Sequence, residues 1–86
     1  MNIKKLYESP KKDQNEEIYG ITSKSCVCCS KPTNEDYFVH MTTEWFAVEA
    51  KVTENDLAKI GMESQGLYAI GYSCAKRMGK KFIINA

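Results

Sequence analysis

Blocks of apolar residues separate the polar stretches of the chain, and three of these blocks have the composition of β-strands. Residues 37–41 are aromatic and β-branched, and residues 45–52 resume that pattern after a polar tripeptide. These two blocks predict an antiparallel hairpin with a short loop. Residues 67–72 form a third strand candidate, whereas residues 82–84 predict either a last short strand or an apolar tail on the core.

Two helix starts lie among these strands. Thr53 precedes Asp56 by three positions, which is the spacing of a capping box, and an apolar face follows as far as Gly61. Ser73 is a favourable N-cap for a second helix that carries Cys74. Short strands mixed with one or two short helices predict an α+β fold.

The first 24 residues are dense in charged and amide side chains and contain only scattered apolar residues. This composition predicts a flexible N-terminal arm over residues 1–24. The alternative is a short helix over residues 3–8 that stops before Pro10. Either way, residues 25–86 are predicted to form one domain.

A chain of 86 residues is short for a hydrophobic core that must stabilise it unaided. Such a core contributes only about 3–5 kcal/mol, so a crosslink would help. The formal charge of +1 gives no global attraction to nucleic acid or to anionic lipid. Nowhere does an apolar run approach the roughly 20 residues of a membrane span, and no apolar segment follows the first lysines. We therefore expect a cytoplasmic protein without membrane contact, whose four cysteines serve as metal ligands or reactive thiols.

The cysteines form a pattern that is typical of zinc sites. Cys26 and Cys29 have C-x-x-C spacing and precede a Ser-Lys-Pro turn, and Cys74 lies far along the chain at a predicted helix start. Structural zinc is four-coordinate, so the only histidine, His40, is the favoured fourth ligand. Cys28 is expected to point away from the ion. The alternative is that His40 packs in the sheet and that Cys28 completes the site.

The knuckle Cys26-x-x-Cys29-Ser-Lys-Pro, together with the segment Ile-Gly-Tyr-Ser-Cys-Ala-Lys-Arg that ends at Arg77, resembles small bacterial and phage zinc-binding proteins of treble-clef or zinc-ribbon type. The resemblance covers residues 25–78 in outline. It implies a treble-clef-like domain with a structural zinc and a binding role, and it names no target. After Cys74 the i+3 position holds Arg77, so a second C-x-x-C is missing.

We therefore expect a binding module rather than an enzyme. The favoured function is an accessory or inhibitory protein, encoded by a phage or mobile element, that binds a host protein. The alternative is a nucleic-acid-binding module, because a helix continuing past Cys74 would carry four basic residues on one face, namely Lys76, Arg77, Lys80 and Lys81. A thiol enzyme is disfavoured because the chain lacks the βαβ context of redox C-x-x-C motifs.

Overall fold

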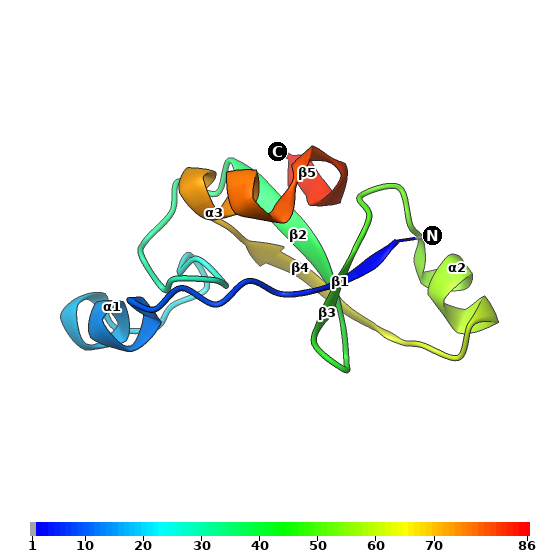
Figure 1. The fold of residues 1–86 in the computed structure, drawn as a ribbon, viewed down its shortest axis with the longest axis horizontal. Helices are drawn as coiled ribbons and strands as arrows, with labels where there is room; N and C mark the ends of the chain where they lie inside the picture. The colour runs from blue at the N-terminus through cyan, green and yellow to red at the C-terminus, as the bar shows by residue number, and fades with distance from the viewer. Residues whose placement is uncertain (1) are drawn as a thin grey trace.

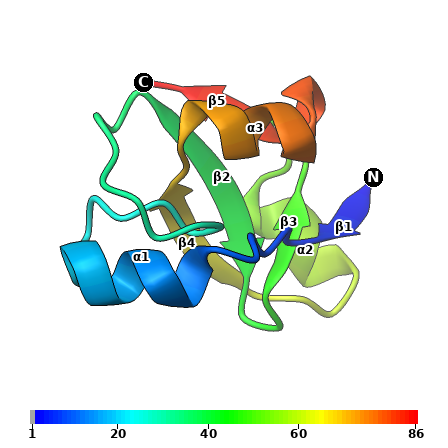
Figure 2. The ribbon, with the colours of Figure 1, turned by 60° about the vertical axis from the view of Figure 1, so that its left-hand side comes forward.

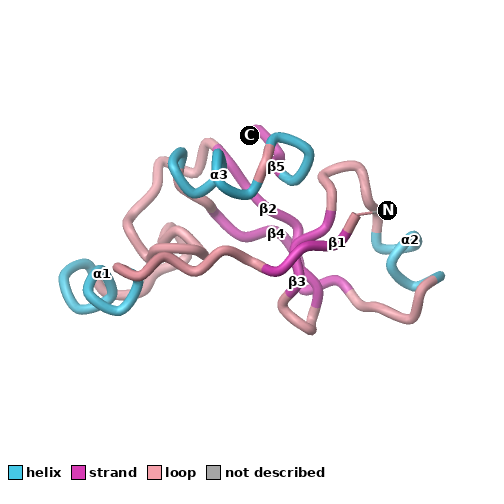
Figure 3. The backbone as a smooth tube through the Cα atoms, viewed as in Figure 1, coloured by secondary structure: helices cyan, strands magenta, loops and turns pink. Residues whose placement is uncertain are grey.

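The computed structural model describes residues 2–86, which form a curled antiparallel sheet with short helices around it (Figures 1 and 3). The elements in chain order are β1 (Ile3–Lys5), α1 (Lys12–Tyr19), β2 (Tyr37–Thr42), β3 (Phe46–Val48), α2 (Glu54–Lys59), β4 (Ser64–Ala69), α3 (Tyr72–Met78), the 3₁₀ helix η1 (Lys80–Phe82) and β5 (Ile83–Asn85). The predicted α+β class is confirmed. The finer treble-clef assignment stays a prediction.

Strand β2 is the centre of the sheet. The order β1-β3-β2-β4 places β4 along one edge of β2, and β5 also pairs with β2. Because β3 pairs with residues 40–41 and β5 with residues 37–39, these two short strands follow one another along the other edge of β2. The hairpin predicted from the two apolar blocks is confirmed as β2 and β3, although β3 is shorter than its block.

The two faces of the sheet pack against different clusters. Val39 and Met41 of β2 lie in the main core cluster with the cysteines and with Met78 of α3. Helix α3 crosses in front of β2 in Figure 2, which agrees with this packing. A smaller cluster contains Val48, Val52 and Leu57, and Leu57 belongs to α2. Side chains alternate between the faces along a strand, so His40 and its partner Val48 of β3 lie on the opposite face from Val39 and Met41. The two clusters therefore lie on opposite faces of the sheet.

The predicted capping box of α2 is confirmed. Thr53 Oγ1 accepts a hydrogen bond from the Asp56 N–H at 3.2 Å, and Asp56 Oδ2 accepts one from the Thr53 N–H at 3.0 Å. The predicted N-cap of α3 is wrong, because that helix begins at Tyr72 and Gly71 is its N-cap. Ser73 therefore lies inside the first turn.

The N-terminal residues have regular structure where their composition predicted a flexible arm. Strand β1 pairs antiparallel with β3, and α1 follows Pro10. The alternative helix over residues 3–8 is wrong, because part of this range is β1. Leu6 is 8% exposed and belongs to the main core cluster. These residues therefore pack on the same core as the rest of the chain.

The basic segment after Cys74 is not one continuous helix. Helix α3 ends at Met78, and Gly79 follows with φ +103°, a conformation that L side chains rarely adopt. Lys80 and Lys81 then belong to η1. The four basic residues therefore do not form the single helical face that the sequence predicted.

Candidate metal centre

A tight turn over residues 25–32 presents the first cysteines. Ser25 and Pro32 form an antiparallel bridge, and between them the Cys26 N–H donates to the Lys31 carbonyl at 2.8 Å. The Ser30 N–H donates to the Cys26 carbonyl at 2.8 Å, and Ser30 has φ +64°. The turn thus holds Cys26 with both of its backbone groups bonded.

The turn contacts the segment that leads into α3. The Val27 N–H donates to the carbonyl of Ala69 at the end of β4 at 2.9 Å. The Gly71 N–H donates to Cys26 Sγ at 3.1 Å. Three residues later, Cys74 lies in the first turn of α3. The backbone therefore brings two segments together that are separated by more than forty positions in the sequence.

Three cysteine sulfurs meet at this junction. The Sγ atoms of Cys26, Cys28 and Cys74 all lie within 4.8 Å of one another. The exposed fractions of these residues are 1%, 0% and 6%. Such a buried group of thiols, contributed by a turn and a helix, can bind a metal ion.

The three thiols strongly perturb one another. The pKa of Cys26 is lowered, chiefly by hydrogen bonds from the thiols of Cys28 and Cys74, with the Gly71 N–H adding to the effect. The pKa of Cys28 is raised, first by its hydrogen bond to Cys26 and also by burial. The hydrogen bond to Cys26 likewise raises the pKa of Cys74 to about 12.

The expectation that Cys28 points away is wrong. The structure gathers Cys26, Cys28 and Cys74, and Cys29 is not part of this group. Cys29 is half-buried, and together with Cys74 it lines a surface hollow of about 490 Å³. Its carbonyl accepts a hydrogen bond from Asn15 Nδ2 of α1 at 2.8 Å.

Helix α1 and the segment before it hold the turn in place. Ser30 Oγ donates to Glu16 Oε1 at 3.1 Å, and the Ser9 N–H donates to the Cys28 carbonyl at 2.9 Å. Asn15, which bonds Cys29, is itself only 7% exposed. The residues predicted to form a separate arm thus support the cysteine turn.

The structure does not bring His40 to the cysteine group. His40 lies on β2 between Val39 and Met41, which pack with the cysteines, so its side chain faces the opposite side of the sheet. There His40 Nε2 and Ser64 Oγ share a hydrogen bond of 2.7 Å. This placement agrees with the alternative in which His40 packs in the sheet.

The donor set fits a thiophilic metal. Four thiolates at about 2.3 Å from a tetrahedral ion lie about 3.8 Å from one another, so three sulfurs within 4.8 Å need little movement to share one ion. Oxygen-preferring cations such as Mg²⁺ and Ca²⁺ do not match sulfur donors. The cluster is therefore compatible with metal binding, and its ligands do not by themselves identify the metal.

The four predicted basic residues do not gather at one place. Lys76 Nζ lies 4.8 Å from the ring centroid of Tyr72, and the Arg77 guanidinium lies 5.0 Å from that of Tyr7. Lys80 lines the same hollow as Lys76, whereas Arg77 lines the hollow beside Cys29 and Cys74. Lys81 is exposed on η1.

Comparisons of the chain with models of protein families, with curated proteins and with solved structures gave no match. Among residues 2–86, no helix has both the length and the apolar composition that crossing a membrane requires.

Proposed function

We propose that the chain is a non-enzymatic binding module held together by one structural zinc ion, with Cys26, Cys28 and Cys74 as ligands. The observation that carries this proposal is the meeting of three buried sulfurs within 4.8 Å. Thiolates are preferred ligands of zinc in closed structural sites. The Gly71 N–H directed at Cys26 Sγ supports it further, because such a donor stabilises an anionic sulfur.

We propose Cys29 as the fourth ligand, in place of His40. Cys29 neighbours Cys28 in the same turn and borders the same hollow as Cys74. A rotation about its Cα–Cβ bond changes only the position of a half-buried thiol. His40 would have to cross to the other face of β2 and lose its bond to Ser64.

A closed shell of four thiolates favours a structural role over a catalytic one, because catalytic zinc keeps a position open for water or substrate. When bound, the ion would crosslink the turn to α3. Its apparent contribution to folding is about 10–16 kcal/mol in zinc-finger peptides at neutral pH. That is more than a core of this size supplies.

Native mass spectrometry of the zinc-loaded protein tests the proposal. We expect its mass to show one zinc per chain. When a strong chelator is added, we expect α3 and the sheet to unfold, and circular dichroism measures this loss of structure. Cys28→Ser and Cys29→Ser form a matched pair, because they make the same change at neighbouring positions. We expect Cys28→Ser to abolish stoichiometric zinc and Cys29→Ser to weaken its affinity at least tenfold, as expected for a lost ligand.

Full zinc affinity in Cys28→Ser would contradict the ligand set read from the cluster. Full zinc affinity in Cys29→Ser would contradict only the assignment of Cys29 as the fourth ligand. His40→Ala then tests whether His40 is that ligand. A chain that folds without any metal would contradict the structural role.

For the binding role, we propose a protein partner that contributes an extended apolar segment. An apolar groove of about 390 Å³ lies beside β4, and its apolar lining includes Ile21, Trp45, Leu67 and Tyr68. Leu67 is 55% exposed and Ile21 is 73% exposed. Since β4 ends the strand order, its outer edge pairs with no other strand of residues 2–86. Val27 bonds the Ala69 carbonyl at one end of this edge, so an extended peptide can add along the part of β4 before Ala69. An accessory or inhibitory protein of a phage or mobile element would use such a groove to bind an extended segment of a host protein.

Affinity capture from nuclease-treated bacterial lysate tests this role. Leu67→Ser changes the groove, and Ile60→Ser changes a similarly exposed aliphatic residue that follows α2 (51% exposed). We expect one defined protein to bind the parent and the Ile60 variant, and to be lost with Leu67→Ser. Equal recovery by all three, or recovery of nucleic acid alone, would contradict the proposal.

A further inference from the structure

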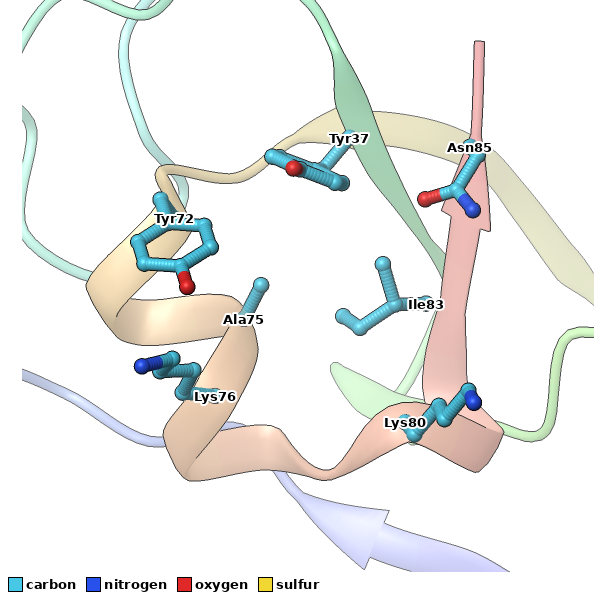
Figure 4. Close-up of a pocket in the computed structure, with 7 residues that line it drawn as sticks. All are labelled: Tyr37, Tyr72, Ala75, Lys76, Lys80, Ile83 and Asn85. Atoms are coloured by element: carbon cyan, nitrogen blue, oxygen red, sulfur yellow. The ribbon is translucent and has the colours of Figure 1, made fainter.

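A hollow of about 440 Å³ lies between α3 and β5, on a different part of the surface from the β4 groove (Figure 4). Its volume is in the range of small-molecule sites, roughly 300–1,000 Å³. Tyr37 and Tyr72 form its aromatic side, with ring centroids 6.1 Å apart and ring planes tilted by 44°. Ala75 and Ile83 project into the space beside these rings (Figure 4).

The polar groups of the hollow favour an anion. Lys76 and Lys80 line the side away from Tyr37, and Asn85 of β5 lies on the opposite wall from α3 (Figure 4). None of the lining residues is acidic. Lysines in a hollow whose lining carries no carboxylate attract phosphate, and the Asn85 amide can both donate and accept hydrogen bonds.

We propose that this hollow binds a nucleotide. Its planar base would stack against the aromatic side over Ile83. The Lys76 ammonium, which lies 4.8 Å from the Tyr72 ring centroid, and the Lys80 ammonium on the β5 side would both turn toward its phosphate. An aromatic face, an aliphatic floor and two cations within one hollow match the base and the phosphate together. The nucleotide is either free or part of a single strand, since both present the same chemistry. This site goes beyond the zinc and protein-binding proposals and requires neither.

Titration of the full folded chain, with whatever metal it retains on purification, tests the site when it is followed by amide NMR shifts. The probes are adenosine monophosphate, a uridine pentanucleotide and inorganic phosphate. We expect both nucleotide probes to shift the amides of Tyr37, Tyr72 and Ile83, with an affinity that falls as salt is raised. Tighter binding of the pentanucleotide indicates a single strand, and equal binding indicates a free nucleotide. Both results support the proposal. The proposal would be overturned if neither nucleotide probe shifted these amides, or if inorganic phosphate alone shifted them equally.

Three variants separate stacking from charge. Tyr72 is 60% exposed, so Tyr72→Ala should keep the fold and the zinc content while it weakens nucleotide binding about 5- to 100-fold. Lys80→Gln should weaken binding and lower the salt slope by about 1. Lys59→Gln, which removes an exposed lysine from α2, is the control and should change neither. Equal losses in the Lys80 and Lys59 variants would overturn the assignment of the phosphate position.

Discussion

His40 is 6% exposed, and its Nε2 lies 2.7 Å from Ser64 Oγ. This bond joins β2 to β4 on the face of the sheet away from the cysteines. Ser64 Oγ also accepts a hydrogen bond from the Gly66 N–H at 3.1 Å, at the start of β4. His40 therefore fixes the beginning of an edge strand.

We expect His40→Ala to lower the free energy of unfolding by about 1–3 kcal/mol, because it leaves a polar partner without its bond. Its zinc content should equal that of the parent. Urea unfolding of His40→Ala, Ser64→Ala and the double variant measures the coupling, which we expect to be about 1 kcal/mol. Zinc loss in His40→Ala would contradict the placement of this ring.

At the residue scale, the sequence predicted Cys26 and Cys74 as partners in one site and gave Cys28 only as the alternative to His40. The C-x-x-C spacing favoured Cys29 because it assumes that the first and last cysteines of a turn converge. Three cysteines within four positions offer alternative pairings, and the choice depends on the backbone path of the turn. The bonds from Ser9 to Cys28 and from Asn15 to Cys29 constrain that path, and both come from a segment whose position the sequence did not reveal.

Among the elements, α2 was predictable because its start is encoded locally. The side chains of Thr53 and Asp56 each accept a hydrogen bond from the other residue's backbone N–H within a single turn, so the capping box needs no tertiary contact. The end of α3 was less predictable. Basic residues on both sides of Gly79 are compatible with a continuing helix, and only the positive φ at this glycine separates α3 from η1.

The capping box predicts how α2 responds to acid. The hydrogen bond from the Thr53 N–H holds the pKa of Asp56 below its ordinary value of 3.8. The stabilisation is therefore complete above the unfolded pKa and is lost as the pH falls through the lower folded pKa. We expect Asp56→Asn to be less stable than the parent near neutral pH, with the difference closing in acid. Urea midpoints of the zinc-loaded proteins, taken from neutral pH downward as far as zinc stays bound, measure this.

Glu54→Gln is the control for that measurement, because it removes a carboxylate from the same helical turn but lies outside the capping box. We expect its stability difference from the parent to depend less on pH than that of Asp56→Asn. A constant difference between Asp56→Asn and the parent across the whole range would contradict the role of the carboxylate.

At the scale of the whole molecule, the chain is elongated, with principal extents of 40 × 21 × 19 Å. Helices α1 and α2 lie near opposite ends of the long axis (Figure 1). Leu6 connects the N-terminal segment to the main core, and Lys4 Nζ donates a hydrogen bond to the Met78 carbonyl at the end of α3. The two ends of the sequence are thus packed together.

We expect Leu6→Ala to lower the free energy of unfolding by about 2–5 kcal/mol, as is typical of a leucine removed from a core. Ile3→Ala changes a residue of the same segment that is 40% exposed, and it should cost less than about 1 kcal/mol. Chemical denaturation of the zinc-loaded variants measures both. Equal and small effects of the two variants would contradict the packing of Leu6 in the core. They would agree instead with the flexible arm that the sequence predicted.

The packing of the N-terminal segment was not predictable because its few apolar residues have no clear periodicity. β1 has only three residues and depends on β3 for its hydrogen bonds. Helix α1 has one buried residue, Asn15, so it lacks the apolar face that sequence patterns detect. Its position depends on polar contacts with the cysteine turn.

The central position of β2 has a consequence for the order of folding. Tyr37–Val39 pair with β5, and residues 38–42 pair with β4, so β2 acquires these two neighbours only after β3 has been synthesised. The turn with Cys26 and Cys28 likewise waits for Cys74. A nascent chain that stops before residue 64 can form only the β1, β2 and β3 part of the sheet, and one that stops before residue 74 lacks both β5 and the third cysteine of the cluster. Closure of both the sheet and the cysteine cluster therefore has to wait until residues 74–85 have been synthesised, after β1, β2 and β3 are already available.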